Sequence, residues 1–463
     1  MTTQTQSARV QTNRPDQNRS NRTGVYTGKN RQTPMQKITQ QTGRLPLLFA
    51  GLTLGWAIWI LMTSFAGPHL DISALYFAGW FWGNGQPELI YLAAPDILDD
   101  LGLPDWRAAT AALGVPNQSV TPFVYPPIWA MVFSGPTHAM APMTFFKLAY
   151  LWHMVALLLT AWAAWQLIPP AHRPASEKWG FALFAILFAT WPVLNSFLTN
   201  QPQITVNLLI LLAFLQVSRK REVSGGALLG LAAAFKIAPI LFALIFVLNR
   251  NWRALAATLT VAGGIALFSI AVMGWPLHEV FLARMTRIDE LIFMTKVNYS
   301  PEALLYQLSS LLGGIPSPDG RALRVFTAPE PLWITLLTKA ALIAALIALW
   351  RMTRGLAGDR RVVVQLFLLS LITALFGPLS WAHYFVLPAL LLPALFLIMS
   401  AKRAWGWIAA VLIVSSLFAF SVLHRFNHHF MFTALVPTLV YLGLLLDSLG
   451  AAHRQQRPSA SAG

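Results

Sequence analysis

Long apolar segments follow one another along most of this chain, separated by short polar or basic stretches. A helix needs about 20 residues to cross a membrane, at 1.5 Å per residue. The clear candidates are Leu45–Ala66, Phe145–Ile168, Trp179–Phe197, Ile204–Val217, Leu255–Val272, Leu332–Trp350, Val362–Phe376, His383–Met399, Trp405–Val422 and Phe430–Leu446. The pattern predicts an all-α polytopic membrane protein with about 10–13 transmembrane helices.

Two further apolar segments are interrupted. Tyr125–Met140 contains three prolines, and Gly226–Leu248 contains Lys236 and Pro239. Proline inside a helix removes a backbone hydrogen bond and kinks the helix. At membrane depth such a break is tolerated only against protein or a water-filled cavity. Each segment is therefore open to three interpretations: a single crossing, a short hairpin, or a broken helix.

Charged residues indicate how the segments are oriented. Suppose that the N-terminus is cytoplasmic and that both interrupted segments return to the side from which they start. The basic residues at 219–221, 250–253, 351–361, 402–403 and 454 then face the cytoplasm, as the positive-inside rule expects. Two large loops, about 67–123 and 273–331, face outside and hold 12 of the 17 acidic residues. Their mixed apolar and charged pattern predicts amphipathic helices on the membrane surface.

Composition supports a membrane domain with polar ends. The 463 residues are 56% hydrophobic and 11% charged, whereas soluble domains carry about 25% charged residues. The net charge of +16 does not indicate nucleic acid, because the basic residues flank the apolar segments. The absence of cysteine excludes disulfide and thiolate chemistry. We expect a disordered basic cytoplasmic tail over 1–44, a membrane domain over 45–450 in contact with membrane lipids, and a second cytoplasmic tail over 451–463.

Asp71 is the best-placed carboxylate for chemistry. It follows the first predicted helix closely, which fixes it near the membrane surface, at the depth of a lipid phosphate. A general base needs such fixed placement to reach the proton that it removes. A helix N-cap or a solvated loop acid are the alternatives. The Asp99–Asp100 pair in the same loop is interpreted as a solvated face.

Lys236 is the sharpest single signal, because it lies within an apolar stretch. A lysine at the centre of a spanning helix costs about 2.5–3.5 kcal/mol on insertion scales. That cost falls if the amine meets an anion, and lysine binds phosphate as a point charge. Snorkelling to the surface and an internal ion pair remain alternatives.

Amide, aromatic and histidine side chains flank the predicted outer face. Asn200 and Gln201 can hydrogen-bond sugar hydroxyls, Trp381 can stack on a sugar ring, and His383 can neutralise a phosphate. They are equally compatible with turns and interfacial anchors, as is Tyr125. The histidines at 424, 428 and 429 lack an evident fourth ligand, so we predict no metal.

Several short motifs in this order resemble glycosyltransferase family 87, a group of polyprenyl-phosphate-sugar-dependent membrane enzymes with the GT-C fold. They span about residues 46–400. The motifs are Asp71 with Tyr76, Tyr125-Pro126-Pro127, Gln201 with Asn207, the glycine-rich run from Gly225 to Lys236 with Pro239, Asn298 with Ser300, and Ser380-Trp381-Ala382-His383-Tyr384. At Asn200-Gln201-Pro202, members of the family commonly have Gly before Gln and no Pro after it.

The resemblance implies a donor and a set of roles. The donor would be a polyprenyl phosphate sugar, typically mannose, and neither metal, nucleotide sugar nor other cofactor would enter the active site. Asp71 would be the catalytic base, and Lys236 and His383 would contact the donor phosphate. The remaining substrate-binding candidates are Tyr76, Tyr125, Asn200, Gln201, Asn298, Ser300, Trp381 and Tyr384.

The expected function is transfer of a hexose, with mannose foremost, from polyprenyl phosphate to a lipid or glycan acceptor with inversion. The enzyme would lie in the plasma (inner) membrane with its N-terminus in the cytoplasm and its active site on the outer face. Three alternatives remain open: a pentose transferase of the same superfamily, a lipid-sugar flippase or transporter, and a protein that only anchors a partner.

Overall fold

The computed structural model describes residues 34–93, 98, 102–313, 325–377, 379–427 and 431–456, without the side chains of 34–47. The described residues from Phe49 onward form one compact unit. This unit is almost entirely helical, which confirms the all-α membrane class. Within the described ranges its one sheet is an antiparallel pair, β1 (Leu291–Met294) and β2 (Phe326–Pro329). Of the predicted N-terminal tail, only the part from Pro34 onward is described, and it belongs to the first helix.

Among the described residues, four helices are long and apolar enough to cross a membrane, by length and composition. They are α5 (Pro142–Leu167), α11 (Trp252–Met273), α14 (Leu332–Thr353) and α19 (Phe432–Arg454), and the bent pair of α7 (Trp191–Leu198) and α8 (Gln203–Ser218) is a possible fifth. α11 and α14 bury few of their residues. Their exposed leucine and isoleucine side chains suit contact with lipid. α1 (Pro34–Ser64) and α15 (Gly358–Phe376) complete the longer helices.

Several predicted spans consist of shorter pieces. The span at 179–197 divides at Thr190 into α6 (Ser176–Ala189) and α7. The span at 405–422 divides at Ser416 into α17 (Ala401–Ser415) and α18 (Leu417–His424). The span at 383–399 is a series of short turns, η4 (Ala382–Phe385), α16 (Val386–Leu390) and η5 (Leu392–Leu397), because Pro388 and Pro393 interrupt it. Thr190 and Ser416 pair as an isolated antiparallel bridge, so the two broken helices meet at their breaks.

The first interrupted segment is a single short helix, and the second is a broken helix. The first runs extended to the prolines and then forms α4 (Ile128–Ala139). The second forms α9 (Glu222–Phe235), which ends just before Lys236, and then η3 (Ala238–Phe242) and α10 (Ala243–Leu248). The glycines of α9 have a packing role. A Cβ on Gly226 would lie 2.1 Å from the Ala254 carbonyl oxygen of α11, so only glycine lets these helices approach so closely.

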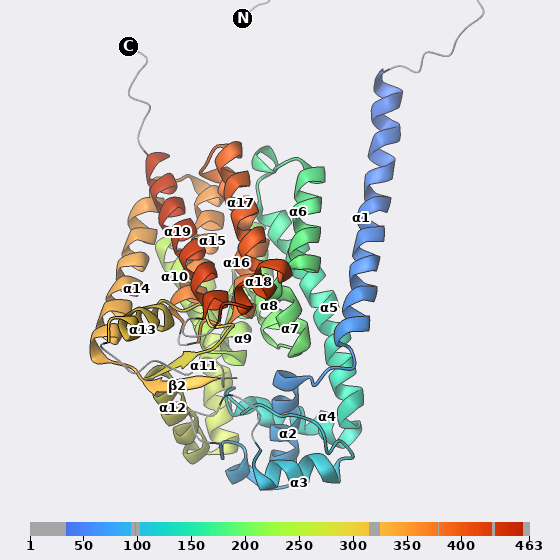
Figure 1. Ribbon diagram of the computed structural model, residues 1–463, viewed down its shortest axis with the longest axis vertical. Coiled ribbons are helices and arrows are strands. Elements are labelled where there is room, and N and C mark those ends of the chain that lie inside the picture. The colour runs from blue at the N-terminus through green and yellow to red at the C-terminus, as the bar shows by residue number, and fades with distance from the viewer. Residues whose placement is uncertain are drawn as a thin grey trace, which may run out of the picture. The chain divides into compact units, whose positions relative to one another are not determined.

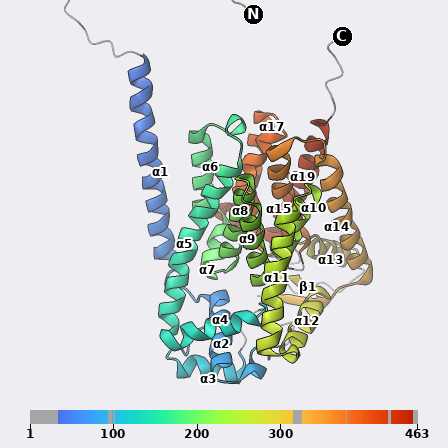
Figure 2. The same cartoon turned by 180° about the vertical axis from the view of Figure 1, so that it is seen from behind.

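The two predicted outer loops contain helices, as expected. The first holds α2 (Leu70–Gly83), η1 (Pro87–Leu89) and α3 (Pro104–Ala112), and the second holds α12 (Trp275–Asp289), β1, α13 (Pro301–Leu311) and β2. In Figures 1 and 2, α2, α3 and α12 gather at the end of the bundle that lies away from the last residues of α19. The Asp99–Asp100 pair, Asp96, His428 and His429 lie outside the described residues. The remaining short element is η2 (Pro170–His172).

Candidate active site

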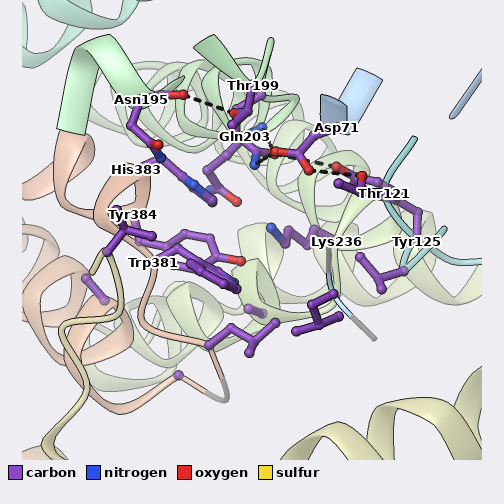
Figure 3. A pocket seen from close by; sticks show the side chains of 18 of the residues that line it. Asp71, Thr121, Tyr125, Asn195, Thr199, Gln203, Lys236, Trp381, His383 and Tyr384 are labelled. Carbon is purple, nitrogen blue, oxygen red and sulfur yellow. Dashed lines mark hydrogen bonds between the residues drawn. The ribbon is translucent and has the colours of Figure 1, made fainter. Parts of the chain in front are cut away.

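A cavity of about 1090 Å³ lies among α2, α7, α8, the break after α9 and the turn before η4. Figure 3 shows its polar side chains converging from these separate elements. Seven of the predicted site residues line it: Asp71, Tyr125, Gln201, Lys236, Trp381, His383 and Tyr384. Segments far apart in the sequence thus meet at one site.

Asp71 is the second residue of α2, and its backbone N–H donates to the Thr199 carbonyl at 2.9 Å. Its carboxylate accepts hydrogen bonds from the Gln201 amide at 2.6 Å and the Thr121 hydroxyl at 3.2 Å. Burial raises the pKa of Asp71, while the Thr199 hydroxyl, the Lys236 charge and Thr121 lower it. A carboxylate with a raised pKa is a better proton acceptor, so this environment suits a general base.

Gln201 connects the carboxylate to the opposite wall. Its side-chain oxygen accepts from the Tyr125 hydroxyl at 3.5 Å and from the Gln203 backbone at 3.4 Å. With its oxygen so occupied, its NH₂ group points to Asp71. This arrangement fixes which end of the amide faces the acid.

Asn200 lies behind the cavity wall, where it is fully buried and does not line the cavity. Its NH₂ group donates to the Phe146 carbonyl at 2.9 Å and to His69 Nδ1 at 3.2 Å, and its oxygen accepts from His153 Nδ1 at 2.7 Å. Its φ of 50° is left-handed, a conformation that suits glycine and that asparagine tolerates better than most residues. This accounts for Asn at a position where members of the family commonly have Gly.

Lys236 follows the end of α9 in an extended conformation, and its side chain lines the cavity. Its Nζ lies 4.6 Å from the centre of the Tyr384 ring, a cation–π contact. Within the described part of the chain it makes no ion pair. The ammonium charge is therefore available to an anion in the cavity.

The second outer loop holds the turn that carries Trp381 and His383. Asn298 pairs with Trp381 as an antiparallel bridge, and the Tyr299 N–H donates to the Ser380 carbonyl at 2.7 Å. The His383 ring is buried, and its Nε2 has no hydrogen-bond partner among the described residues. A buried nitrogen without a partner points to a ligand or water that this cavity would supply.

Three more predicted residues, like Asn200, do not line the cavity. The Tyr76 hydroxyl donates to the Met140 carbonyl at 2.9 Å, within an aromatic cluster. Ser300 caps α13 by accepting from the Ala303 N–H at 3.0 Å, and the Asn298 amide donates to the Phe293 carbonyl. Their positions are those of residues that shape the walls, and their part in substrate binding stays a prediction.

Other polar residues of the cavity were not singled out by sequence reasoning. They include Thr121, Asn195, Thr199 and Gln203, whereas Asn207 belongs to one of the motifs that carry the family resemblance. The Gln203 amide donates to Asn207 at 2.9 Å, and its oxygen is buried without a partner in the described chain. The one available signal was spacing, because Gln203 and Asn207 are four residues apart and therefore share a face of α8.

Lys296 also lines the cavity, whereas three other basic residues, Lys339, Arg284 and Arg287, lie outside it and contact other groups. Lys339 pairs with Asp289 at 2.8 Å and is 41% exposed, so it is not a buried charge. Arg284 donates to the Tyr91 carbonyl at 3.3 Å and Arg287 pairs with Glu290 at 2.8 Å, and neither lines the cavity. Over the described residues, no three His, Asp or Glu side chains are grouped as metal ligands would be.

The model of glycosyltransferase family 87 matches residues 123–380, more than half of the chain. The chain therefore belongs to glycosyltransferase family 87, and it is a membrane glycosyltransferase. Asp71 precedes the matched residues, so its assignment depends on the geometry of the cavity.

Curated relatives are similar over most of their length. The chain is 25% identical to a polyprenol-phosphate-mannose-dependent alpha-(1-2)-phosphatidylinositol mannoside mannosyltransferase of Mycobacterium tuberculosis, over 74% of each chain. It is 27% identical to a polyprenol-phosphate-mannose-dependent alpha-(1-2)-phosphatidylinositol pentamannoside mannosyltransferase of Mycolicibacterium smegmatis, over 70% of this chain and 74% of the relative.

Proposed function

We propose that this protein transfers mannose from a polyprenyl phosphate to a hydroxyl of a lipid or glycan acceptor, on the outer face of the membrane and with inversion. One observation carries the proposal: the Asp71 carboxylate shares a cavity with the ammonium of Lys236, which makes no ion pair with the described residues. The names of the relatives support mannose and a polyprenyl phosphate as parts of the donor. They also support a phosphatidylinositol mannoside, a mannose-bearing lipid, as acceptor.

The reaction is a single displacement. The acceptor oxygen forms a bond to the anomeric carbon while the bond from that carbon to the phosphate oxygen breaks. Asp71 takes the proton of the acceptor hydroxyl, and polyprenyl phosphate leaves with the electron pair of the broken bond. One displacement inverts the anomeric configuration. Base catalysis of this kind contributes roughly 10²–10⁴-fold.

Lys236 and His383 stabilise the leaving phosphate. Lys236 provides a fixed positive charge in a largely apolar wall, and His383 Nε2 is buried without a partner among the described residues. Charges and donors fixed in place before the reaction need no reorganisation when the phosphate charge develops. Neither a metal nor another cofactor takes part in this scheme.

The outer-face assignment rests on charge. The basic residues beside the spans favour a cytoplasmic side opposite the two large loops. The first of these loops carries Asp71, and the second pairs with the Trp381 turn through Asn298. A donor that enters from the membrane would then present its phosphate to Lys236 at the level of the broken helix.

The test is an assay of the purified protein in lipid nanodiscs with polyprenyl-phosphate mannose and a phosphatidylinositol mannoside. We expect a mannosylated product whose new linkage has the opposite anomeric configuration to the donor, as read by NMR. Polyprenyl-phosphate pentose and GDP-mannose should give little or no product. Retention of configuration, preference for the pentose donor, or movement of donor across the bilayer without cleavage would each overturn the proposal.

A further inference from the structure

One face of α7, continued by its C-cap residue Thr199, forms a wall of the cavity that leads away from Asp71. Trp191, Asn195 and Thr199 recur at every fourth residue and all line the cavity. Thr199 lies beside Asp71, because its carbonyl accepts from the Asp71 N–H at 2.9 Å. Figure 3 shows Asn195 next to Thr199. At 1.5 Å per residue, Trp191 lies about 12 Å further along the helix than Thr199. This is longer than one pyranose ring.

The far end of this wall is an aromatic stack. The Trp191 and Phe420 rings are 3.9 Å apart at 8°, and the Phe420 and His424 rings are 6.2 Å apart at 12°. All three rings line the cavity. Trp191 begins α7 and Phe420 lies in α18, and these two helices start directly after the bridged breaks at Thr190 and Ser416. The stack therefore lies next to the point where the two breaks meet.

The stack offers an apolar face and also a buried N–H donor that needs an acceptor. The Trp191 Nε1–H is buried and has no acceptor in the described parts of the chain, and an indole nitrogen can only donate. Lys296 lines the same cavity. The pKa of His424 is lowered by burial and then by the charge of Lys296. This effect indicates that the Lys296 cation lies near the stack.

These features favour a sugar over a hydrocarbon chain as the ligand of this part of the cavity. A polyprenyl chain has no acceptor atoms and would leave the Trp191 N–H without a partner, which is unfavourable for a buried donor. A pyranose ring presents a C–H face to an aromatic ring and hydroxyl oxygens to its rim. The Asn195 carboxamide can pair with a hydroxyl as donor or acceptor.

We propose that Trp191, Asn195 and Phe420 form a second sugar subsite, which binds a ring of a glycan acceptor remote from the reacting hydroxyl. This inference rests on the proposed function, and it adds that the preferred acceptor carries more than one sugar. Lys296 would lie beside the bound glycan and favour an acceptor that bears an anionic group.

The experiment compares two probe acceptors, octyl mannoside and octyl mannotrioside, with polyprenyl-phosphate mannose as donor. The measured quantity is the ratio of kcat/KM for the long acceptor to that for the short one. For Trp191→Ala we expect this ratio to fall about tenfold or more relative to wild type, because a hydrogen bond and a stacking face are lost. Trp191→Phe keeps the ring and removes the N–H, so we expect an intermediate fall even if the alanine variant folds poorly.

The control is Trp162→Phe, since Trp162 is a 44% exposed tryptophan of α5 that does not line the cavity. Its ratio should equal that of wild type. An active wild type with an unchanged ratio in both Trp191 variants overturns the subsite alone. The subsite is also overturned if the Trp191 variants raise the donor KM by an amount that grows with polyprenyl chain length, since that result assigns the stack to the donor tail. A wild type inactive with both acceptors overturns the proposed function and the subsite with it.

Discussion

Replacement of Lys236 by methionine removes a cation that lines the cavity while nearly keeping the volume of the side chain. The wild-type ammonium lies in the cavity wall, over the Tyr384 ring at 4.6 Å. We expect two consequences for catalysis. The leaving phosphate loses a fixed counter-charge, and Asp71 loses a nearby cation that lowers its pKa.

The size of the first effect follows from Coulomb's law. Two unit charges about 4 Å apart interact by about 4 kcal/mol at an effective dielectric constant of 20. Each 1.36 kcal/mol of transition-state stabilisation is about tenfold in rate. Since cavity water and the His383 ring compensate for part of this loss, we expect kcat/KM to fall by about 10²–10³-fold.

The second effect is a shift of the pH profile. The base works only when deprotonated, so activity is present above its pKa and is lost as pH falls through it. Without Lys236 the pKa of Asp71 rises. The acidic limb of kcat/KM should therefore move to higher pH.

The assay is kcat/KM against pH for wild type, Lys236→Met and Lys236→Arg, which retains the charge and serves as control. Because a cation in an apolar segment is costly, the methionine variant should unfold at a temperature no lower than wild type. A variant with kcat/KM within threefold of wild type, with an unmoved acidic limb, would refute the role of this charge.

Three further variants probe the walls of the site. Gln201→Leu removes the 2.6 Å hydrogen bond to Asp71; a bond to a charged group is worth about 1.5–3 kcal/mol, so steady-state kcat/KM should fall about 10–100-fold, and unchanged kinetics would contradict this role. Asn200→Ala leaves buried partners unpaired at a left-handed φ of 50° and should cost about 2–4 kcal/mol of stability, seen as a lower unfolding temperature, with Asn200→Gly less affected. Gly226→Val forces a side chain toward the Ala254 carbonyl and should destabilise the fold by about 1–3 kcal/mol; a variant as heat-stable as wild type would argue against close packing there.

The hydrophobic pattern predicted where the long helices lie, because lipid contact requires continuous apolar runs. α5, α11, α14 and α19 correspond to predicted spans. The breaks at Thr190 and Ser416 were not predicted, since they lie far apart in the sequence and meet only in the fold. Pairing between distant segments leaves no local trace in the sequence.

In the site, too, residues with a local sequence signal were predicted, and those that depend on the fold were not. Asp71 was identifiable from its fixed placement just after the first predicted helix, and Lys236 because a lysine in an apolar run is costly unless something uses it. Asn200 was expected to face the sugar, and its side chain is instead buried among His69, His153 and Phe146. The direction of its side chain follows from the left-handed backbone, which a single sequence does not reveal. For the same reason the stack of Trp191 on Phe420 could not be anticipated.

The most direct test of the account is the Asp71→Asn protein, assayed for both donor binding and transfer. Asparagine keeps the shape of the side chain and cannot accept the acceptor's proton. The account predicts that the variant binds polyprenyl-phosphate mannose as wild type does and transfers mannose roughly 10²–10⁴-fold more slowly. An Asp71→Asn protein that binds donor and transfers mannose at the wild-type rate would contradict the assignment of Asp71 as the base.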